Sequence, residues 1–134
     1  MDASAPSRPR IANGYKQSHG AAIAGSGTID VLNPVGAGGV YLKKLVIIGP
    51  AGAAGSQLLL EYVQQVPHGP LLEFPILGLD ASQALNVVTD LDELFVPPGS
   101  SAPVDIRFFN PGGAATGALT LFLSWFDPLA QPEA

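Results

Sequence analysis

The two stretches that decide the fold lie in the last third of the chain. Val104–Phe108 reads VDIRF, and Leu119–Phe126 reads LTLFLSWF. In each stretch, counted from its first residue, every second side chain is apolar. This is the period of a β-strand, in which successive side chains lie on opposite faces. We therefore expect two strands with their apolar faces turned to a common core, and Trp125 on the inward face of the second.

The same kind of text extends back to about residue 22. Short apolar or alternating runs are separated by clusters of Gly and Pro, a pattern typical of β-strands joined by turns. We expect further strands at 28–32, 40–48, 57–66, 84–89 and 93–96, and Pro75 makes 71–77 an edge strand or an extended loop. About eight strands of ordinary length predict an all-β fold, an antiparallel β-sandwich of jelly-roll-like type.

The first twenty residues differ from the rest of the chain. They are rich in Pro, Ser and Gly and show neither strand nor helix periodicity, so we expect an extended N-terminal arm over 1–20 before a sandwich domain over 21–134. The arm holds Arg8, Arg10 and Lys16, half of the six basic residues, while the rest of the chain is acidic. These three side chains are predicted to meet acidic groups on a partner or a neighbouring subunit, although a disordered tail is the alternative.

Composition narrows the class of protein. The 134 residues suit one domain, and the lack of cysteine excludes disulfides, thiolate zinc sites and cysteine nucleophiles. Only 13% of residues are charged and 47% are hydrophobic, so we expect neighbouring subunits to cover part of the surface, as in a homo-oligomer. The acidic body disfavours nucleic-acid binding. The apolar runs are too short to span a membrane, and no secretory signal is recognisable, so we expect synthesis in a cytoplasm.

Residues able to carry chemistry are few. The only histidines are His19 and His68, in the expected arm and in a turn, and both are predicted to be solvated. The acidic run at Asp90, Asp92 and Glu93 could bind calcium, but it lacks the spacing of a calcium loop, and a solvated turn is the favoured interpretation. We therefore expect no catalytic residues, no metal and no cofactor; the chain is predicted not to be an enzyme.

Two aromatic side chains remain unexplained by a core. The alternation of the strands sends Phe109 and Phe126 to the outer face. If their strands are neighbours, the two rings predict a covered surface, because aromatic residues anchor protein interfaces. Phe109 and Phe126 thus join Arg8, Arg10 and Lys16 as candidate partner-binding residues.

The layout from about residue 22 to 128 resembles the small β-sandwich auxiliary proteins of tailed bacteriophages, especially head decoration (cement) proteins. The features that carry the resemblance are the cysteine-free, Gly/Ala/Pro-rich chain, the polar arm, and the turn at 94–99 (LFVPPG) before two long strands that end in Ser124-Trp125-Phe126. It is a likeness of layout with no diagnostic motif.

The resemblance implies a non-enzymatic virion structural protein on the capsid surface, made in the host cytoplasm. Such a protein would form an oligomer, with a homotrimer favoured, and would strengthen the capsid by bridging subunits of the major capsid protein. Phage tail, baseplate or fibre components fit the layout nearly as well. A carbohydrate-binding jelly-roll module is a further alternative, which predicts solvent-facing aromatic residues in a groove.

Overall fold

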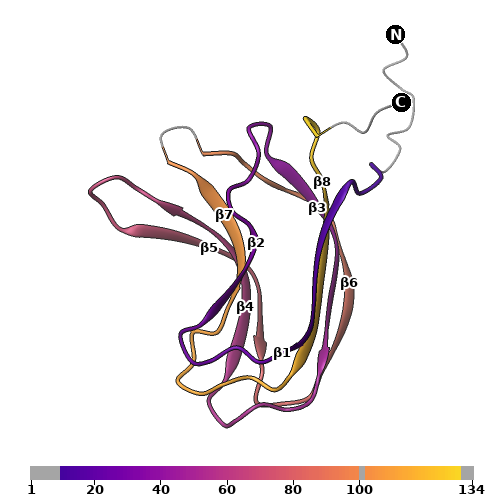
Figure 1. The fold of residues 1–134 in the computed structure, drawn as a ribbon, viewed down its shortest axis with the longest axis vertical. Coiled ribbons are helices and arrows are strands. Elements are labelled where there is room, and N and C mark those ends of the chain that lie inside the picture. Colours follow the sequence, from indigo (N-terminus) through magenta and orange to yellow (C-terminus); the bar gives the residue numbers. More distant parts are fainter. Residues whose placement is uncertain (1–9, 100–101, 131–134) are drawn as a thin grey trace.

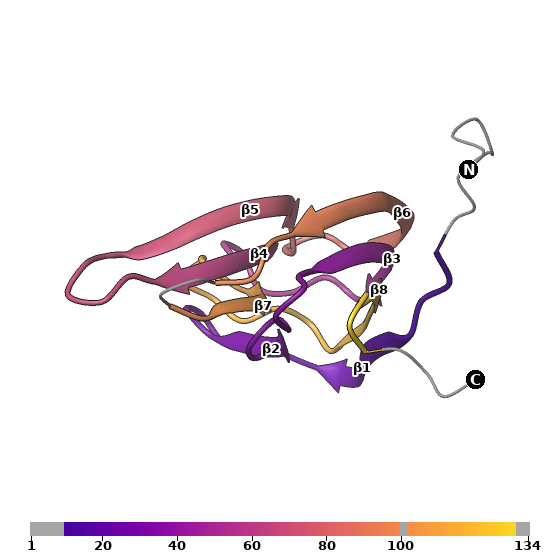
Figure 2. The same cartoon turned by 90° about the horizontal axis from the view of Figure 1, so that it is seen from above.

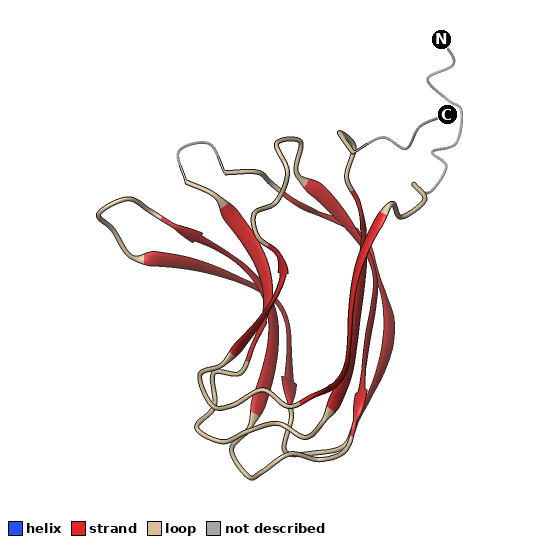
Figure 3. Ribbon diagram, viewed as in Figure 1, coloured by secondary structure: helices blue, strands red, loops and turns tan. Residues whose placement is uncertain are grey.

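The computed structural model describes residues 10–99 and 102–130, and the regular structure within them consists of β-strands (Figure 3). The strands are β1 (Gly14–Ala21), β2 (Thr28–Leu32), β3 (Val40–Gly49), β4 (Gln57–Gln65), β5 (Leu71–Asp80), β6 (Leu85–Val96), β7 (Val104–Phe109) and β8 (Leu119–Phe126). Across this part of the chain there is no helix long and apolar enough to cross a membrane.

The strands form two four-stranded antiparallel sheets that pack against each other (Figures 1 and 2). Sheet A has the order β1-β8-β3-β6, and sheet B has the order β2-β7-β4-β5. Along the chain, successive strands alternate between the sheets except at the β4–β5 hairpin, and this path is the double Greek key of a jelly roll. The predicted fold class, an antiparallel β-sandwich of about eight strands, is therefore confirmed.

The core lies between the sheets and follows from the alternation. In β7, Val104, Ile106 and Phe108 are buried, and in β8 Leu119, Leu121, Leu123 and Trp125 are buried. Trp125 therefore faces inward as predicted. Gly14 of β1 lies against the indole ring, because a β-carbon at this position would overlap Trp125 Nε1. A glycine is what allows the edge strand to pass over the tryptophan.

The predicted arm over 1–20 is wrong in its second half, because Gly14–Ala21 is a strand of sheet A. Tyr15, Lys16 and Gln17 of β1 pair in antiparallel register with Ser124, Leu123 and Phe122 of β8. The strand buries little of its side chains, so it shows no apolar alternation in the sequence. Its place comes from main-chain hydrogen bonds to the edge of β8, which any non-proline sequence can form. The first nine residues of the expected arm lie outside the described part of the chain.

Strand β6 is one strand where the sequence predicted two. It runs for 12 residues, with a bulge in its pairing with β3 between Leu42 and Lys44. Opposite the bulge, Asp92 and Glu93 have φ angles of 54° and 56°, and the Asp90 carboxylate accepts a hydrogen bond from Asp92 N at 2.8 Å. The acidic run that we interpreted as a turn therefore lies within β6, at this bulge.

One end of the sandwich is closed by a buried asparagine. Asn110, which follows β7, donates to the carbonyl oxygens of Ile23 at 3.0 Å and Ala114 at 2.7 Å. Its own side-chain oxygen accepts hydrogen bonds from Gln57 N at 3.1 Å and Gly112 N at 2.9 Å. The side chain thus satisfies main-chain groups of three loops at once and fixes this end of the two sheets.

At the opposite end, the β4–β5 hairpin extends beyond the rest of the sandwich. Both views show its turn, residues 66–70, far from sheet A (Figures 1 and 2). β5 forms one edge of sheet B, so the prediction of an edge strand around Pro75 is confirmed. The divergence leaves the end of the hairpin without an opposing sheet.

Candidate functional site

The outer face of sheet A carries a band of apolar side chains across all four strands. Val46 of β3 pairs with Phe122 of β8 on one side and with Val88 of β6 on the other, and all three alternate with core residues. Tyr15 of β1 stacks on the Phe122 ring at a centroid distance of 5.8 Å. Tyr15 is 66% exposed, Val88 60% and Ile48 of β3 41%. We call Tyr15, Val46, Ile48, Val88 and Phe122 the apolar face of sheet A.

The two central strands explain this band. β3 reads VYLKKLVIIG and β8 reads LTLFLSWF, so both hold large apolar residues on both of their faces. Such strands are typical of sheets that are covered on both sides. Within the described residues, sheet B covers one side only, and the other side is the apolar face of sheet A. The composition of β3 and β8 therefore accounts for the apolar surface that is left exposed on the outer side of sheet A.

Beside this band, a cluster of rings and charges holds the start of the described chain. The Arg10 guanidinium lies 4.2 Å from the centroid of the Tyr41 ring and 5.9 Å from that of Phe126. Arg10 N donates to the Glu93 carboxylate at 2.9 Å, and Lys43 Nζ donates to the same oxygen at 2.8 Å. The hydrogen bond from Lys43, together with that from Arg10 N, lowers the pKa of Glu93 to about 2.

Two of the predicted partner-binding residues, Arg10 and Phe126, are thus brought together. The acidic group that binds Arg10 is Glu93 of the same chain, whereas we expected a partner to supply it. Lys16 is exposed on β1, an edge strand of sheet A, where it pairs in register with Leu123 of β8. Arg8 lies outside the described residues.

Phe109 lies apart from these residues. It is on β7 in sheet B, whereas Phe126 is on β8 in sheet A, so the two rings are not on neighbouring strands and the condition for a covered surface shared by both is not met. Strands that are adjacent in sequence belong to opposite sheets here, which alternation alone does not reveal. Phe109 is half-buried, and the Arg107 guanidinium covers it at 4.9 Å from the ring centroid.

Arg107 also organises a charge cluster on the outer side of sheet B that the sequence did not predict. Its Nε donates to Glu61 Oε2 at 2.7 Å, and its Nη2 donates to Glu73 Oε2 at 3.2 Å. Glu61 has no exposed surface, and its Oε1 has no hydrogen-bond partner. Burial raises the pKa of Glu61 despite the opposing effect of Arg107, and burial together with the charge of Asp30 raises the pKa of Asp105. The sequence feature that could have indicated this cluster is Glu61, a single charged residue within the apolar run of β4.

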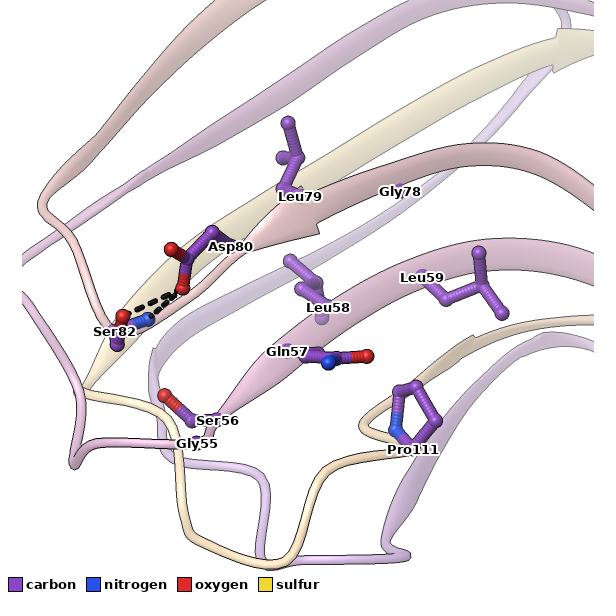
Figure 4. Close-up of a pocket in the computed structure, with 10 residues that line it drawn as sticks. All are labelled: Gly55, Ser56, Gln57, Leu58, Leu59, Gly78, Leu79, Asp80, Ser82 and Pro111. Carbon is purple, nitrogen blue, oxygen red and sulfur yellow. Dashed lines mark hydrogen bonds between the residues drawn. The ribbon is translucent and has the colours of Figure 1, made fainter.

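A hollow of about 610 Å³ lies at the Asn110 end of sheet B (Figure 4). It is lined by Gly55, Ser56, Gln57, Leu58, Leu59, Gly78, Leu79, Asp80, Ser82 and Pro111. The Asp80 carboxylate accepts hydrogen bonds from Ser82 N at 3.0 Å and Ser82 Oγ at 2.6 Å, and these bonds lower its pKa. No lining residue is aromatic or basic, so the hollow offers one carboxylate already engaged by the chain and an amide.

The residues considered for metal chemistry do not converge. His19 is exposed in β1, and His68 is exposed in the β4–β5 turn. In the region that the structure describes, no group of three His, Cys, Asp or Glu side chains is arranged to hold a metal ion. Of the acidic run, Glu93 is engaged by Lys43 and Arg10.

The chain matches no protein-family model, and no significant match was found among curated proteins or among solved structures.

Proposed function

We propose that this protein is a non-enzymatic structural component that works by packing the apolar face of sheet A against other protein subunits. The observation that carries the proposal is the exposed apolar band that crosses all four strands, with Tyr15 and Val88 at 66% and 60% exposure. Apolar patches of this extent on soluble domains usually mark interaction sites. Aromatic residues among them add the side chains that most often anchor such contacts.

The setting we propose is a virion, with the protein as a capsid decoration protein that oligomerises, as a trimer, and bridges subunits of the major capsid protein. Two observations support this setting. One is the layout resemblance to bacteriophage decoration proteins, and the other is the jelly-roll topology, which recurs in viral capsid proteins. The same fold hosts lectins and enzymes, so the topology supports the proposal only by analogy. A phage tail, baseplate or fibre component would use the same apolar face.

A carbohydrate-binding module is the weaker candidate. Such a module predicts a groove with solvent-facing aromatic side chains, and the hollow of Figure 4 has no aromatic lining residue. The exposed rings Tyr15 and Phe95 lie on strands of sheet A and Phe74 lies on β5 of sheet B, and none of the three lines that hollow.

The test is whether the protein is a fixed component of virus particles. Particles purified on a density gradient from cells infected by the virus that encodes the chain should contain it at a constant ratio to the major capsid protein. A Val88→Glu variant should fold and yet be missing from the particles, because the contact would bury an unpaired charge. A Gln83→Glu variant, with the same added charge in the turn between β5 and β6, should be incorporated normally. Wild-type protein that is folded in the lysate but absent from the particles would contradict the proposal.

A further inference from the structure

The outer side of sheet B holds two carboxyl groups on one guanidinium. Glu61 of β4 accepts a hydrogen bond from Arg107 Nε at 2.7 Å, and Glu73 of β5 accepts one from Arg107 Nη2 at 3.2 Å. Glu73 pairs with Val63, two residues along β4 from Glu61, so the two glutamates are diagonal neighbours on the same side of the sheet. Long side chains in such positions are within reach of each other. Arg107 therefore holds side by side two groups whose charges repel each other.

The second oxygen of the Glu61 carboxyl group lacks a hydrogen-bond donor. Glu61 has no exposed surface, and among the described residues nothing donates to its Oε1. A buried acceptor without a donor is costly, and a carboxylate removes this cost when it takes up a proton. Because Oε1 is enclosed, a proton is small enough to reach it, whereas a hydrated ion or the side chain of another protein is not. The arrangement therefore favours a proton as the missing partner.

A proton on Glu61 also changes its relation to Glu73. Two ionised carboxylates can only accept hydrogen bonds, whereas a protonated carboxyl group donates one to its neighbour. Burial raises the pKa of Glu61, the hydrogen bond and charge of Arg107 oppose this rise, and the charge of Glu73 together with a hydrogen bond to it adds to the rise. The pair of glutamates thus binds a proton more readily than an isolated glutamate does.

The other charged side chains on this side of sheet B are acidic. They are Asp30 of β2, Asp105 of β7 and Asp80 at the far end of β5. Asp30 pairs with Arg107 from the strand opposite β4, and Asp105 lies two residues from Arg107 along β7. Among the strands that the structure describes in sheet B, Arg107 is the one basic residue. A proton on the pair of glutamates therefore reduces an excess of negative charge.

The two glutamates lie where the β4–β5 ladder is interrupted. The pairing shifts register between Leu60 and Glu61, which leaves Ile76 as an extra residue in β5. Glu61 itself pairs with Pro75. A bulge disrupts the ladder locally, and proline has no N–H to donate to it. Beyond this point the hairpin, residues 62–74, diverges from sheet A (Figure 1). The pair of glutamates therefore bridges an interruption in the main-chain pairing of the hairpin.

From these observations we propose that Glu61 and Glu73 share one proton, and that this proton helps to hold the outer part of the β4–β5 hairpin, residues 62–74, on sheet B. Below the folded-state pKa of Glu61, its carboxyl group donates to Glu73 while Arg107 donates to both. As the pH rises through that pKa, which lies above the ordinary value, the proton leaves to water and the two carboxylates repel each other. The hairpin then opens more often, while the sandwich stays folded. This link is independent of the contact proposed for sheet A.

Carbon-13 NMR of the side-chain carboxyl groups of the full-length protein measures the sharing. In the wild type, one titration step should appear in the signals of both Glu61 and Glu73, at a pH above the ordinary pKa of 4.5. Glu73→Gln removes the second charge and should weaken proton binding by Glu61 at least about threefold. The matched control Asp30→Asn removes a carboxylate that neighbours Arg107 but not Glu61, so proton binding by Glu61 should stay nearly unchanged. Unchanged proton binding in Glu73→Gln would show that burial alone acts on Glu61, and it overturns the proposal.

Hydrogen exchange measures whether the proton holds the hairpin. After correction for intrinsic exchange rates, the protection of amides in 62–74 should fall at least about threefold as the pH rises through the pKa of Glu61, while amides of β8 keep their protection. Glu61→Gln, whose amide donates to Glu73 at every pH, should keep the hairpin protected throughout.

Glu73→Gln ends the repulsion and should weaken the pH dependence of hairpin protection. If Glu61→Gln does not fold, Glu73→Gln decides, because the Glu73 side chain is 45% exposed and its replacement is tolerated. Hairpin protection that is independent of pH in the wild type overturns the proposal. An equal fall in the hairpin and in β8 also overturns it, since the proton would then act on the whole fold.

Discussion

The ion pair between Arg107 and Glu61 offers a sharp test of the energetics of sheet B. Glu61 has no exposed surface, and its hydrogen bond from Arg107 stabilises the charged form of the buried carboxylate. Replacing Arg107 by Met keeps much of the side-chain volume over Phe109 but leaves the Glu61 carboxylate buried without a partner. Breaking a buried pair in this way typically destabilises a protein by about 3–5 kcal/mol.

The pH sets how much of this loss appears. An unpaired buried carboxyl group can take up a proton, and at pH 7 protonating a group with the ordinary pKa of 4.5 costs about 3.4 kcal/mol, which caps the electrostatic loss. At pH 5 the same cost is only about 0.7 kcal/mol. In the wild type, burial already raises the pKa of Glu61, so its contribution to stability is fully present below pH 4.5 and declines as the pH rises through the folded-state pKa. Without Arg107 that decline should be steeper.

Urea denaturation at pH 5 and pH 7 measures the effect, with the midpoint compared at constant slope. We expect Arg107→Met to lose more stability at pH 7 than at pH 5, by at most about 2.7 kcal/mol, and by less to the extent that the wild type also declines over this range. In a Glu61→Gln background the same substitution should cost only about 1 kcal/mol at either pH, since the exposed pair with Glu73 is worth little. Equal losses at the two pH values in the presence of Glu61 would refute the reasoning.

Two further pairs of substitutions test how the side chains of sheet A are packed. Trp125→Ala should lower the free energy of unfolding by about 3–5 kcal/mol, and Phe126→Ala on the outer face should lower it by clearly less. Chemical denaturation of both variants measures the two losses. A larger loss for Phe126→Ala would show that the faces of β8 are exchanged. Gly14→Ala should lower the free energy of unfolding by about 1–3 kcal/mol, because the added methyl group would overlap the Trp125 ring. In the control Gly113→Ala the methyl group would meet no atom within 4 Å, so the thermal midpoint should stay nearly unchanged. Equal midpoints for the two variants would mean that β1 is not held against Trp125.

The sequence was sufficient for the class of fold, because strands that face a core must alternate. The residues of β7 and β8, with Trp125 inward and Phe126 outward, could be assigned from the period of two alone. Pro75 likewise limited the segment around it to an edge strand or an extended loop, since proline cannot donate to a sheet ladder. These features belong to single strands and their immediate neighbours, which is why no tertiary information was needed.

The candidate sites were harder to predict, because they depend on which strands become neighbours. The pairing of β8 with β3, rather than with β7, separates Phe126 from Phe109 and places Phe126 beside Tyr41. The same pairing assembles the apolar face of sheet A from strands distant in sequence. Glu61 is fully buried, and the pairing of β4 with β7 places Arg107 beside it.

By itself, then, the sequence determined that the chain forms an antiparallel β-sandwich and which side of its central strands faces the core. Tertiary structure alone decided that Gly14–Ala21 is a strand, that the β4–β5 hairpin extends past its cover, and which apolar surfaces remain open. The physical reason is the difference between the two kinds of contact. Core packing requires apolar side chains at the inward-facing positions of a strand, so it produces an alternation of period two in the sequence. Edge pairing uses main-chain hydrogen bonds that almost every residue can make, and exposure depends on what lies opposite in space.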